Sequence, residues 1–118
     1  MRYHKDLGFP KTIVLPTNQL YLIYSKHATV RYGENALSFK LKKIKIKLED
    51  IIEIRTKDNI TCSSILIRRK HDRNRDIVLS LKISAKKAVV ITLWVNNKGD
   101  NHKTLNKNLY DTYERCND

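Results

Sequence analysis

The sequence feature that most constrains this fold is an alternation of apolar and polar side chains between residues 37 and 95. Successive side chains of a strand point to opposite faces, so a period of two indicates a strand with one buried face. Short polar segments separate the alternating stretches, as in strands joined by tight turns. The apolar positions are Ile44, Ile46, Leu48, Ile52 and Ile54, then Ile77, Leu79, Leu81 and Ile83, then Val89, Ile91, Leu93 and Val95.

The breaks in this pattern predict where the chain turns. Glu49 and Asp50 interrupt the first stretch, so we expect a bend there. Residues 60–69 form a further predicted strand, followed by a charged turn at residues 71–76. Three or four consecutive strands with short connections indicate an antiparallel meander.

The N-terminal part of the chain is expected to behave differently. Residues 1–18 contain both prolines, which exclude a central strand and predict an extended arm lying on the domain. Residues 19–25 suit a strand or the entry to a helix. Ser25 can cap a helix of at most two turns, with Gly33 at its C-terminal end.

These features together predict a single domain spanning residues 1–118. The expected fold is α+β, with a short N-terminal helical segment packed on a four- to five-stranded antiparallel sheet. The tail, residues 103–118, is expected to be a small C-terminal helix or a docked extended segment. Leu105, Leu109 and Tyr113 would anchor it.

The charge of the chain points to a polyanionic partner. The sequence has 24 Lys+Arg against 12 Asp+Glu, a net charge of +12. Nucleic acid and anionic membrane are the candidates, with a surface kept basic for solubility alone as the alternative. No apolar run approaches the roughly 18 residues that a membrane span needs. Cys62 and Cys116 have neither disulfide-framework nor zinc spacing, which favours reduced thiols and a cytoplasmic location.

Two basic runs are candidate phosphate contacts. One lies at residues 40–47 on a predicted strand, and the other surrounds the turn after residue 67. A row of lysines can also protect an edge strand, and a basic turn can simply be solvated. The candidate nucleic-acid-binding residues in these runs are Lys43, Lys45, Lys47, Arg69, Lys70, Arg73 and Arg75, with Arg68 as a basic residue of a central strand.

His27 and Arg31 form the first candidate catalytic pair. They are four residues apart and share one face if residues 26–33 are helical. Imidazole can exchange a proton near neutral pH, and guanidinium binds phosphate oxygens in a two-pronged geometry. The alternative is a solvated helix face, because this spacing often occurs by chance.

A second cluster follows the last predicted strand. His102 is flanked by Asp100, which can orient an imidazole, and by Lys103 and Thr104. Thr92 and Trp94 share one strand face, from which the indole could stack on a base. The alternatives are an exposed turn histidine, a cross-strand threonine and a core tryptophan. The candidate residues here are Thr92, Trp94, His102, Lys103 and Thr104.

Other chemistries lack their sequence signatures. The three glycines, at positions 8, 33 and 99, form no phosphate-binding loop. No cysteine or histidine spacing is typical of a metal site, and no cluster of carboxylates suggests magnesium. We therefore expect a metal-independent mechanism without a cofactor.

The segments YSKHATVRYG (24–33) and ITLWVNNKGDNHKTLNKNLY (91–110) together resemble small phage-type proteins related to the barnase, colicin and RelE class of ribonucleases. The resemblance implies an α+β fold and metal-independent RNA cleavage that leaves a cyclic phosphate. It implies catalytic roles for His27, Arg31, Arg68, Thr92, His102 and Thr104. RNA would be the partner, together with an acidic antidote protein if the toxin analogy holds, in a cytoplasm that is the host's if the protein is viral.

Three functions follow from these observations. The first is a toxin- or phage-type endoribonuclease in which His27 and His102 act as general base and acid. The second is a non-catalytic basic nucleic-acid-binding domain that needs neither histidine. The third is a pleckstrin-like module that binds anionic lipid. The sequence leaves the oligomeric state open.

Overall fold

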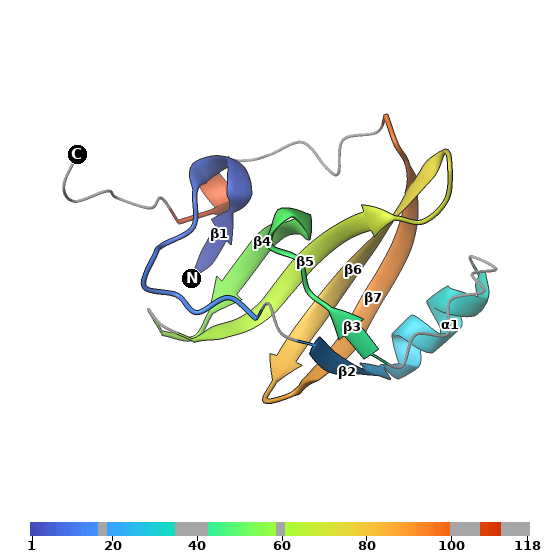
Figure 1. The fold of residues 1–118 in the computed structure, drawn as a ribbon, viewed down its shortest axis with the longest axis horizontal. Helices are drawn as coiled ribbons and strands as arrows, with labels where there is room; N and C mark the ends of the chain where they lie inside the picture. The colour runs from blue at the N-terminus through green and yellow to red at the C-terminus, as the bar shows by residue number, and fades with distance from the viewer. Residues whose placement is uncertain (17–18, 35–42, 59–60, 100–106, 112–118) are drawn as a thin grey trace.

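The structure is a computed structural model that describes residues 1–16, 19–34, 43–58, 61–99 and 107–111. Its main element is one sheet of seven strands (Figure 1). The strands are β1 (Arg2–His4), β2 (Gln19–Tyr24), β3 (Lys43–Lys45), β4 (Ile51–Thr56), β5 (Cys62–Lys70), β6 (Arg75–Ser84) and β7 (Lys87–Asn97).

The strands lie side by side in the order β1-β4-β5-β6-β7-β2-β3. β4 to β7 are consecutive antiparallel neighbours, as the alternation of the sequence predicts. β1 pairs antiparallel with β4 at one edge. At the other edge β2 pairs parallel with β7, and β3 pairs antiparallel with β2. The sheet is therefore mixed.

The predicted architecture, a short N-terminal helical segment packed on a four- to five-stranded antiparallel sheet, is wrong. The sheet has seven strands and contains a parallel pair. The difference comes from β1, β2 and β3, which are short and pair with segments distant in the sequence. β1 arises inside the segment expected to be an extended arm. Such pairings depend on the surrounding fold more than on local propensity, so they leave little local pattern.

The helix α1 (Lys26–Glu34) follows β2. Ser25 caps it as predicted, since its Oγ accepts a hydrogen bond from the backbone N–H of Ala28 at 3.0 Å. Of the described helix side chains only Ala28 is buried. A helix this polar has no apolar stripe with which to cover a sheet. It packs beside β7 instead (Figure 1).

The remaining helical structure in the described chain consists of single 3-10 turns. The predicted bend at Glu49 and Asp50 is the turn Leu48–Asp50, which separates β3 from β4. Leu48 was expected among the alternating apolar residues but is exposed, because the turn interrupts the strand. The other turns are Lys5–Leu7 and Lys107–Leu109. None of the described helices is long and apolar enough to cross a membrane.

One face of the sheet carries the hydrophobic core. The segment between β1 and β2, and the segment from β3 to β4, pass over this face (Figure 1). They contribute Ile13, Ile44 and Ile46 to the core, with Phe9 and Leu15 packed against it. Burial of these apolar side chains is the main force that holds the covering segments on the sheet. The largest fully buried side chains that the central strands contribute to this core are Ile51, Ile54, Ile67, Ile77, Leu79, Leu81, Val90 and Leu93.

Candidate functional site

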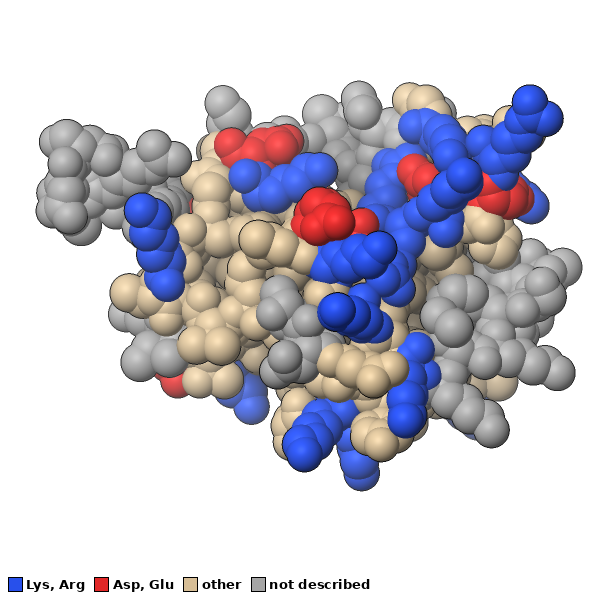
Figure 2. Space-filling view, viewed as in Figure 1, with Lys and Arg blue, Asp and Glu red and all other residues tan. Residues whose placement is uncertain are grey.

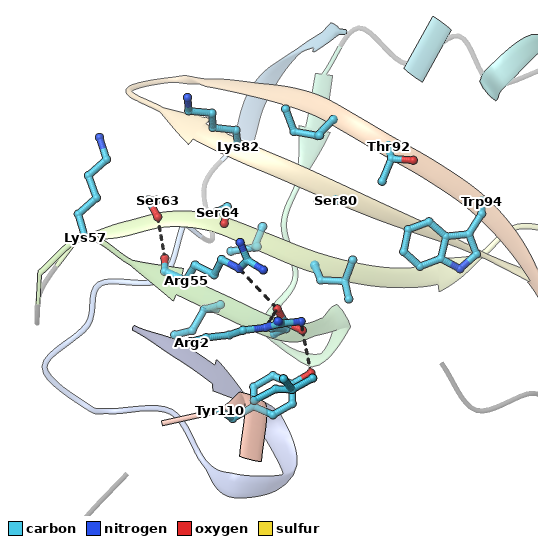
Figure 3. A pocket seen from close by; sticks show the side chains of 16 residues that line it. Arg2, Arg55, Lys57, Ser63, Ser64, Ser80, Lys82, Thr92, Trp94 and Tyr110 are labelled. Carbon is cyan, nitrogen blue, oxygen red and sulfur yellow. Dashed lines mark hydrogen bonds and ion pairs between the residues drawn. The ribbon is translucent and has the colours of Figure 1, made fainter. Parts of the chain in front are cut away.

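A pocket with a volume of about 770 Å³ lies on the sheet face opposite the core (Figure 3). We call this the pocket face. Its side chains alternate along the strands with the core residues. Ser64, Ser80, Thr92 and Trp94 all line the pocket, and all are partly exposed. The face is therefore accessible in the middle of the sheet, where sheets covered on both sides are buried.

Arg55, Ser64 and Lys82 form one row across β4, β5 and β6, which we call the basic row. Arg55 is paired with Ser64, and Ser64 is paired with Lys82. Directly paired side chains share a face and have Cβ atoms about 5 Å apart. A long cationic side chain on each side of a small serine can reach a common point above it. Lys57 lines the same end of the pocket (Figure 3).

A second row crosses the sheet beside the basic row. Leu66 is paired with Ser80, and Ser80 with Thr92. One step further along β7, Trp94 projects towards the pocket (Figure 3). The two hydroxyls can each donate and accept a hydrogen bond, and the indole offers a large flat apolar surface.

A β-bulge in β7 brings Ile91 to the pocket. Ser80 pairs with Thr92 while Leu81 pairs with Val90, so Ile91 has no residue opposite it. The alternation of β7 predicted Ile91 on the same face as Leu93, which is fully buried. Ile91 is instead 42% exposed and lines the pocket. A bulge changes the facing of one residue without changing the apolar pattern, so the sequence alone does not predict it.

The side of the pocket next to β1 is built around Glu53. This carboxylate is 7% exposed and accepts hydrogen bonds from Arg2 Nε at 2.5 Å and from the Tyr110 hydroxyl at 2.9 Å. The guanidinium carbon of Arg2 lies 5.0 Å from the centre of the Tyr110 ring. His4 packs edge-on against the same ring at 5.1 Å. These contacts dock the residues after the 3-10 turn 107–109 against β1.

These contacts also change the acidity of the groups. The hydrogen bond to Glu53 raises the pKa of the Arg2 guanidinium. Burial raises the pKa of the Tyr110 phenol, and its hydrogen bond to Glu53 raises it further. Both groups therefore keep their protons at neutral pH and hold the Glu53 carboxylate between them.

The pocket keeps a net positive charge after Glu53 is accounted for. Arg2 and Glu53 form a two-pronged ion pair, so their charges balance. Arg55 Nε lies 3.9 Å from Glu53 Oε1, and its side chain is 57% exposed. Lys57 and Lys82 are exposed and form no ion pair with a described residue. Glu53 is the only carboxylate among the described residues that line the pocket. The remaining cations therefore suit the pocket to bind an anion.

Two of the predicted catalytic residues lie on the pocket face. Thr92 lines the pocket. Arg68 lies in the row of Trp94, since both are paired with Val78. Its Nε donates a hydrogen bond to Asp76 at 2.9 Å, and its NH2 group donates to the carbonyl of Asn97 at 3.1 Å. Arg68 is therefore held as a structural bridge between three strands.

The other predicted catalytic residues are not brought to the pocket by the described part of the chain. His27 is exposed on α1 and does not line the pocket. The side chain of Arg31 and the whole of His102 and Thr104 lie outside the described residues, as does Lys103. Cleavage by two histidines therefore stays a prediction.

The first basic run follows its predicted alternation. Lys43, Lys45 and Lys47 are exposed while Ile44 and Ile46 are buried. Lys43 Nζ lies 4.9 Å from the centre of the Tyr21 ring, on the neighbouring strand β2. This contact places a cation beside an exposed aromatic ring at the edge of the sheet.

The second basic run is largely held by acidic neighbours. Arg69 donates from Nε to Asp50 at 3.1 Å and from NH2 to the carbonyl of Lys45 at 2.8 Å. Arg75 pairs with Asp72 at 2.7 Å and lowers the pKa of that carboxyl. Lys70 and Arg73 are exposed. Figure 2 shows basic and acidic side chains interleaved over the β5–β6 hairpin at the upper right. The hairpin is therefore less cationic than its sequence suggests.

Sequence analysis identified Thr92 and Trp94 but missed most of the pocket. Ser64, Ser80 and Lys82 alternate with predicted core residues, so their common face was predictable. Their pairing was not, because it depends on the register between strands. Tyr110 and Arg2 are far apart in the sequence, and they come into contact because Tyr110 docks against β1, the strand that contains Arg2. The missed lining residues are Arg2, Glu53, Ile54, Arg55, Lys57, Ser63, Ser64, Ile65, Leu66, Ser80, Lys82, Ile91, Leu109 and Tyr110.

Within the described residues no group of three or more His, Cys, Asp or Glu side chains is placed to hold a metal ion. Cys62 is buried, and burial raises the pKa of its thiol to about 11. Its thiolate is therefore scarce at neutral pH. No protein-family model matches the chain, and no curated protein or solved structure is significantly similar to it.

Proposed function

We propose that this protein binds single-stranded RNA on the pocket face of its sheet. The observation that carries the proposal is a pocket that combines Trp94 with three cations, Arg55, Lys57 and Lys82, on an accessible sheet face. Proteins that bind single strands combine base stacking on aromatic rings with a basic groove that follows the phosphates. Both parts are present here within one cavity.

The shape of the site favours a single strand over a duplex. A base can reach Trp94 inside a pocket only if it is unstacked from its neighbours, as bases in single strands are. The Ser80 and Thr92 hydroxyls lie between the basic row and Trp94. They are suited to hydrogen bonds with a ribose, whose 2′-hydroxyl both donates and accepts. This favours RNA over DNA.

The surface beyond the pocket supports the same partner. The net charge of +12 attracts a polyanion over a distance of about one Debye length, and this speeds association. Figure 2 shows a second group of basic side chains along the lower edge, near β2, β3 and the β6–β7 turn. Binding to these groups would release counterions from the strand. The affinity should then fall steeply with salt. A plot of the logarithm of the binding constant against the logarithm of the salt concentration should have a slope of about −0.7 for each phosphate bound.

The intrinsic fluorescence of Trp94 tests this proposal directly, because it is the only tryptophan in the chain. Titration with a short single-stranded RNA at low salt should quench the emission, and the matching DNA should bind more weakly. A duplex of the same sequence should leave the emission near its starting value. Salt-dependent RNA binding without any change in Trp94 emission would place the interface elsewhere.

Substitution of Trp94 measures its share of the affinity. A base stacked on an aromatic ring contributes roughly 1–3 kcal/mol, so Trp94→Leu should raise Kd by about 5- to 150-fold. Trp94→Phe keeps an aromatic ring and should lose less affinity than Trp94→Leu. Lys11→Gln is the matched control for a surface change, because Lys11 is exposed in the segment that covers the core face. Fluorescence anisotropy with a labelled RNA gives Kd for all of these variants.

Equal affinities for Trp94→Leu and the native protein would contradict the proposal. Circular dichroism of each variant confirms that the sheet is retained, so that lost binding is not lost folding. The same titration with vesicles containing anionic lipid tests the lipid-binding alternative. Quenching of Trp94 by vesicles and not by RNA would favour that alternative.

A further inference from the structure

An exposed apolar strip leads across the sheet to the pocket. Tyr21 and Ile23 on β2 are 51% and 45% exposed, and Ile91 on β7 is 42% exposed. Ile23 is paired with Val89, which links the two strands on this face. Side chains this apolar, flanked by Lys43 over the Tyr21 ring, form a surface on which successive bases can lie.

We call the other end of this path, next to β1, the closed side, because its side chains are held in packed contacts. Arg2, Leu109 and Tyr110 line the pocket along β1, which is the edge strand of the sheet. The Tyr110 ring is fixed between Arg2 and His4, and its hydroxyl is bound to Glu53. A strand that crosses from β2 towards β1 therefore meets a packed side of the pocket. The last nucleotide of such a strand would occupy the pocket.

The basic row lies just before this closed side. Lys82, Ser64 and Arg55 follow one another from β6 to β4 by direct pairing. Glu53, the one carboxylate among the described residues of the pocket, forms a two-pronged ion pair with Arg2 and lies 3.9 Å from Arg55 Nε. A phosphate at the end of a chain carries a charge of about −1.5 to −2 at neutral pH, whereas an internal phosphodiester carries only one. Cations on the two strands either side of Ser64 favour the more highly charged group.

We infer that Arg55, Ser64 and Lys82 form a subsite for the terminal phosphomonoester of a nucleic-acid strand. This inference rests on the proposed function and names the substrate class more narrowly. The guanidinium of Arg55 would grip two phosphate oxygens, Lys82 would supply a second charge, and the Ser64 hydroxyl would donate a hydrogen bond. The 5′ and 3′ ends share this chemistry, so the experiment separates them.

The test compares three versions of one short RNA, with a 5′-phosphate, with a 3′-phosphate, or with hydroxyls at both ends. One phosphorylated version should bind at least about tenfold more tightly than the hydroxyl-ended strand. The reason is that its terminal phosphate adds negative charge that can accept charge-assisted hydrogen bonds from Arg55 and Lys82. The double variant Arg55→Gln/Lys82→Gln should bind every strand more weakly than the native protein does, because both residues belong to the proposed RNA site, and it should bind all three strands with equal affinity. Lys11→Gln should retain the full preference.

Two outcomes overturn the inference alone and leave the proposed function standing. Equal affinities of the native protein for all three strands would remove the subsite and leave RNA binding intact. An unchanged preference in the double variant would place phosphate recognition elsewhere.

If no strand binds, calorimetry with a nucleoside and its monophosphate decides. Binding of the monophosphate alone, lost in the double variant, would keep the subsite and reject the proposed function. Binding of neither would reject both.

Discussion

Glu53 shows how one residue links the stability of this protein to its candidate site. Its carboxylate is buried and binds Arg2 and Tyr110, at 2.5 Å and 2.9 Å. Hydrogen bonds to a charged group each contribute about 1.5–3 kcal/mol. Because the Arg2 side chain is 32% exposed, water will compensate part of the loss. We expect Glu53→Gln to lower the free energy of unfolding by about 1.5–3 kcal/mol in total, measured by urea denaturation.

Glu49→Gln is the matched control for this residue. Glu49 is exposed in the 3-10 turn before β4, and surface changes of this kind stay within about 0.5 kcal/mol. An equally small effect of Glu53→Gln would mean that Arg2 and Tyr110 do not depend on the charge of Glu53. The closed side of the pocket would then need another explanation.

At the scale of elements, residues 107–111 act as a cover for the edge strand β1. Asp111 donates its backbone N–H to the carbonyl of Arg2 at 2.7 Å, and its side chain accepts from the Arg2 N–H at 2.6 Å. An uncovered edge strand can pair with other chains. The segment thus satisfies part of the β1 edge and places Tyr110 at the pocket.

This docking predicts a pH dependence of stability at alkaline pH. Burial and the bond to Glu53 raise the pKa of Tyr110 above its ordinary value near 10. Below about pH 10 both folded and unfolded states hold this proton, so its contribution to stability is complete. Above that pH the unfolded chain loses the proton first. The free energy of unfolding should therefore fall as the pH rises through the folded pKa.

Tyr110→Phe isolates this effect, since it keeps the ring and removes the hydroxyl. The native protein should be the more stable of the two near neutral pH, and the difference should shrink over the alkaline range above about pH 10. Tyr3, whose pKa burial also raises, is present in both proteins and cancels in the difference. A difference that stays constant over this range would show that the Tyr110 hydroxyl does not couple to folding.

The elements differ in how well the sequence predicts them. β6 and β7 pair in a local meander, so period and turn signals were sufficient to predict both strands but not the bulge at Ile91. The pairing of β2 with β7 is parallel and joins residues 21–24 to residues 87–90, and no short-range pattern encodes that. The cap at Ser25 was predictable because capping is local. The predicted length of α1, at most two turns with Gly33 at its C-terminal end, was wrong, because the helix spans nine residues and runs past Gly33 to Glu34. Its position beside β7 was not predicted either.

The candidate site follows the same rule. Trp94 and Thr92 were placed on one face by alternation along a single strand. The basic row was not predicted, since it combines one residue from each of three strands. Arg55 lies just before a bulge, at which the register shifts by one residue, so counting along β4 and β5 would not align it with Ser64. Sites built across strands need the register, which only the fold supplies.

At the scale of the whole molecule, the position of His27 relative to the pocket separates binding from cleavage. His27 is exposed on α1, and the pocket is lined by strands β4 to β7 together with Arg2, Leu109 and Tyr110. We therefore expect His27→Ala to leave the Kd for single-stranded RNA unchanged within about twofold, while Lys82→Gln weakens binding of a phosphorylated strand. RNA incubated with excess native protein and a chelator should remain intact on a denaturing gel, whatever its sequence.

Cleavage under these conditions would instead support the two-histidine hypothesis. A positioned general acid or base contributes about 10²–10⁴ in rate, so His102→Ala would then slow cutting by that factor without loss of folding. Loss of cutting in both His27→Ala and His102→Ala, with unchanged Kd, would show that a catalytic centre exists apart from the pocket. Intact RNA with all three proteins, combined with tight binding, would mean that the basic surface of this sheet serves recognition alone. Because the binding and cleavage assays use the same RNA, they measure the two functions on one substrate.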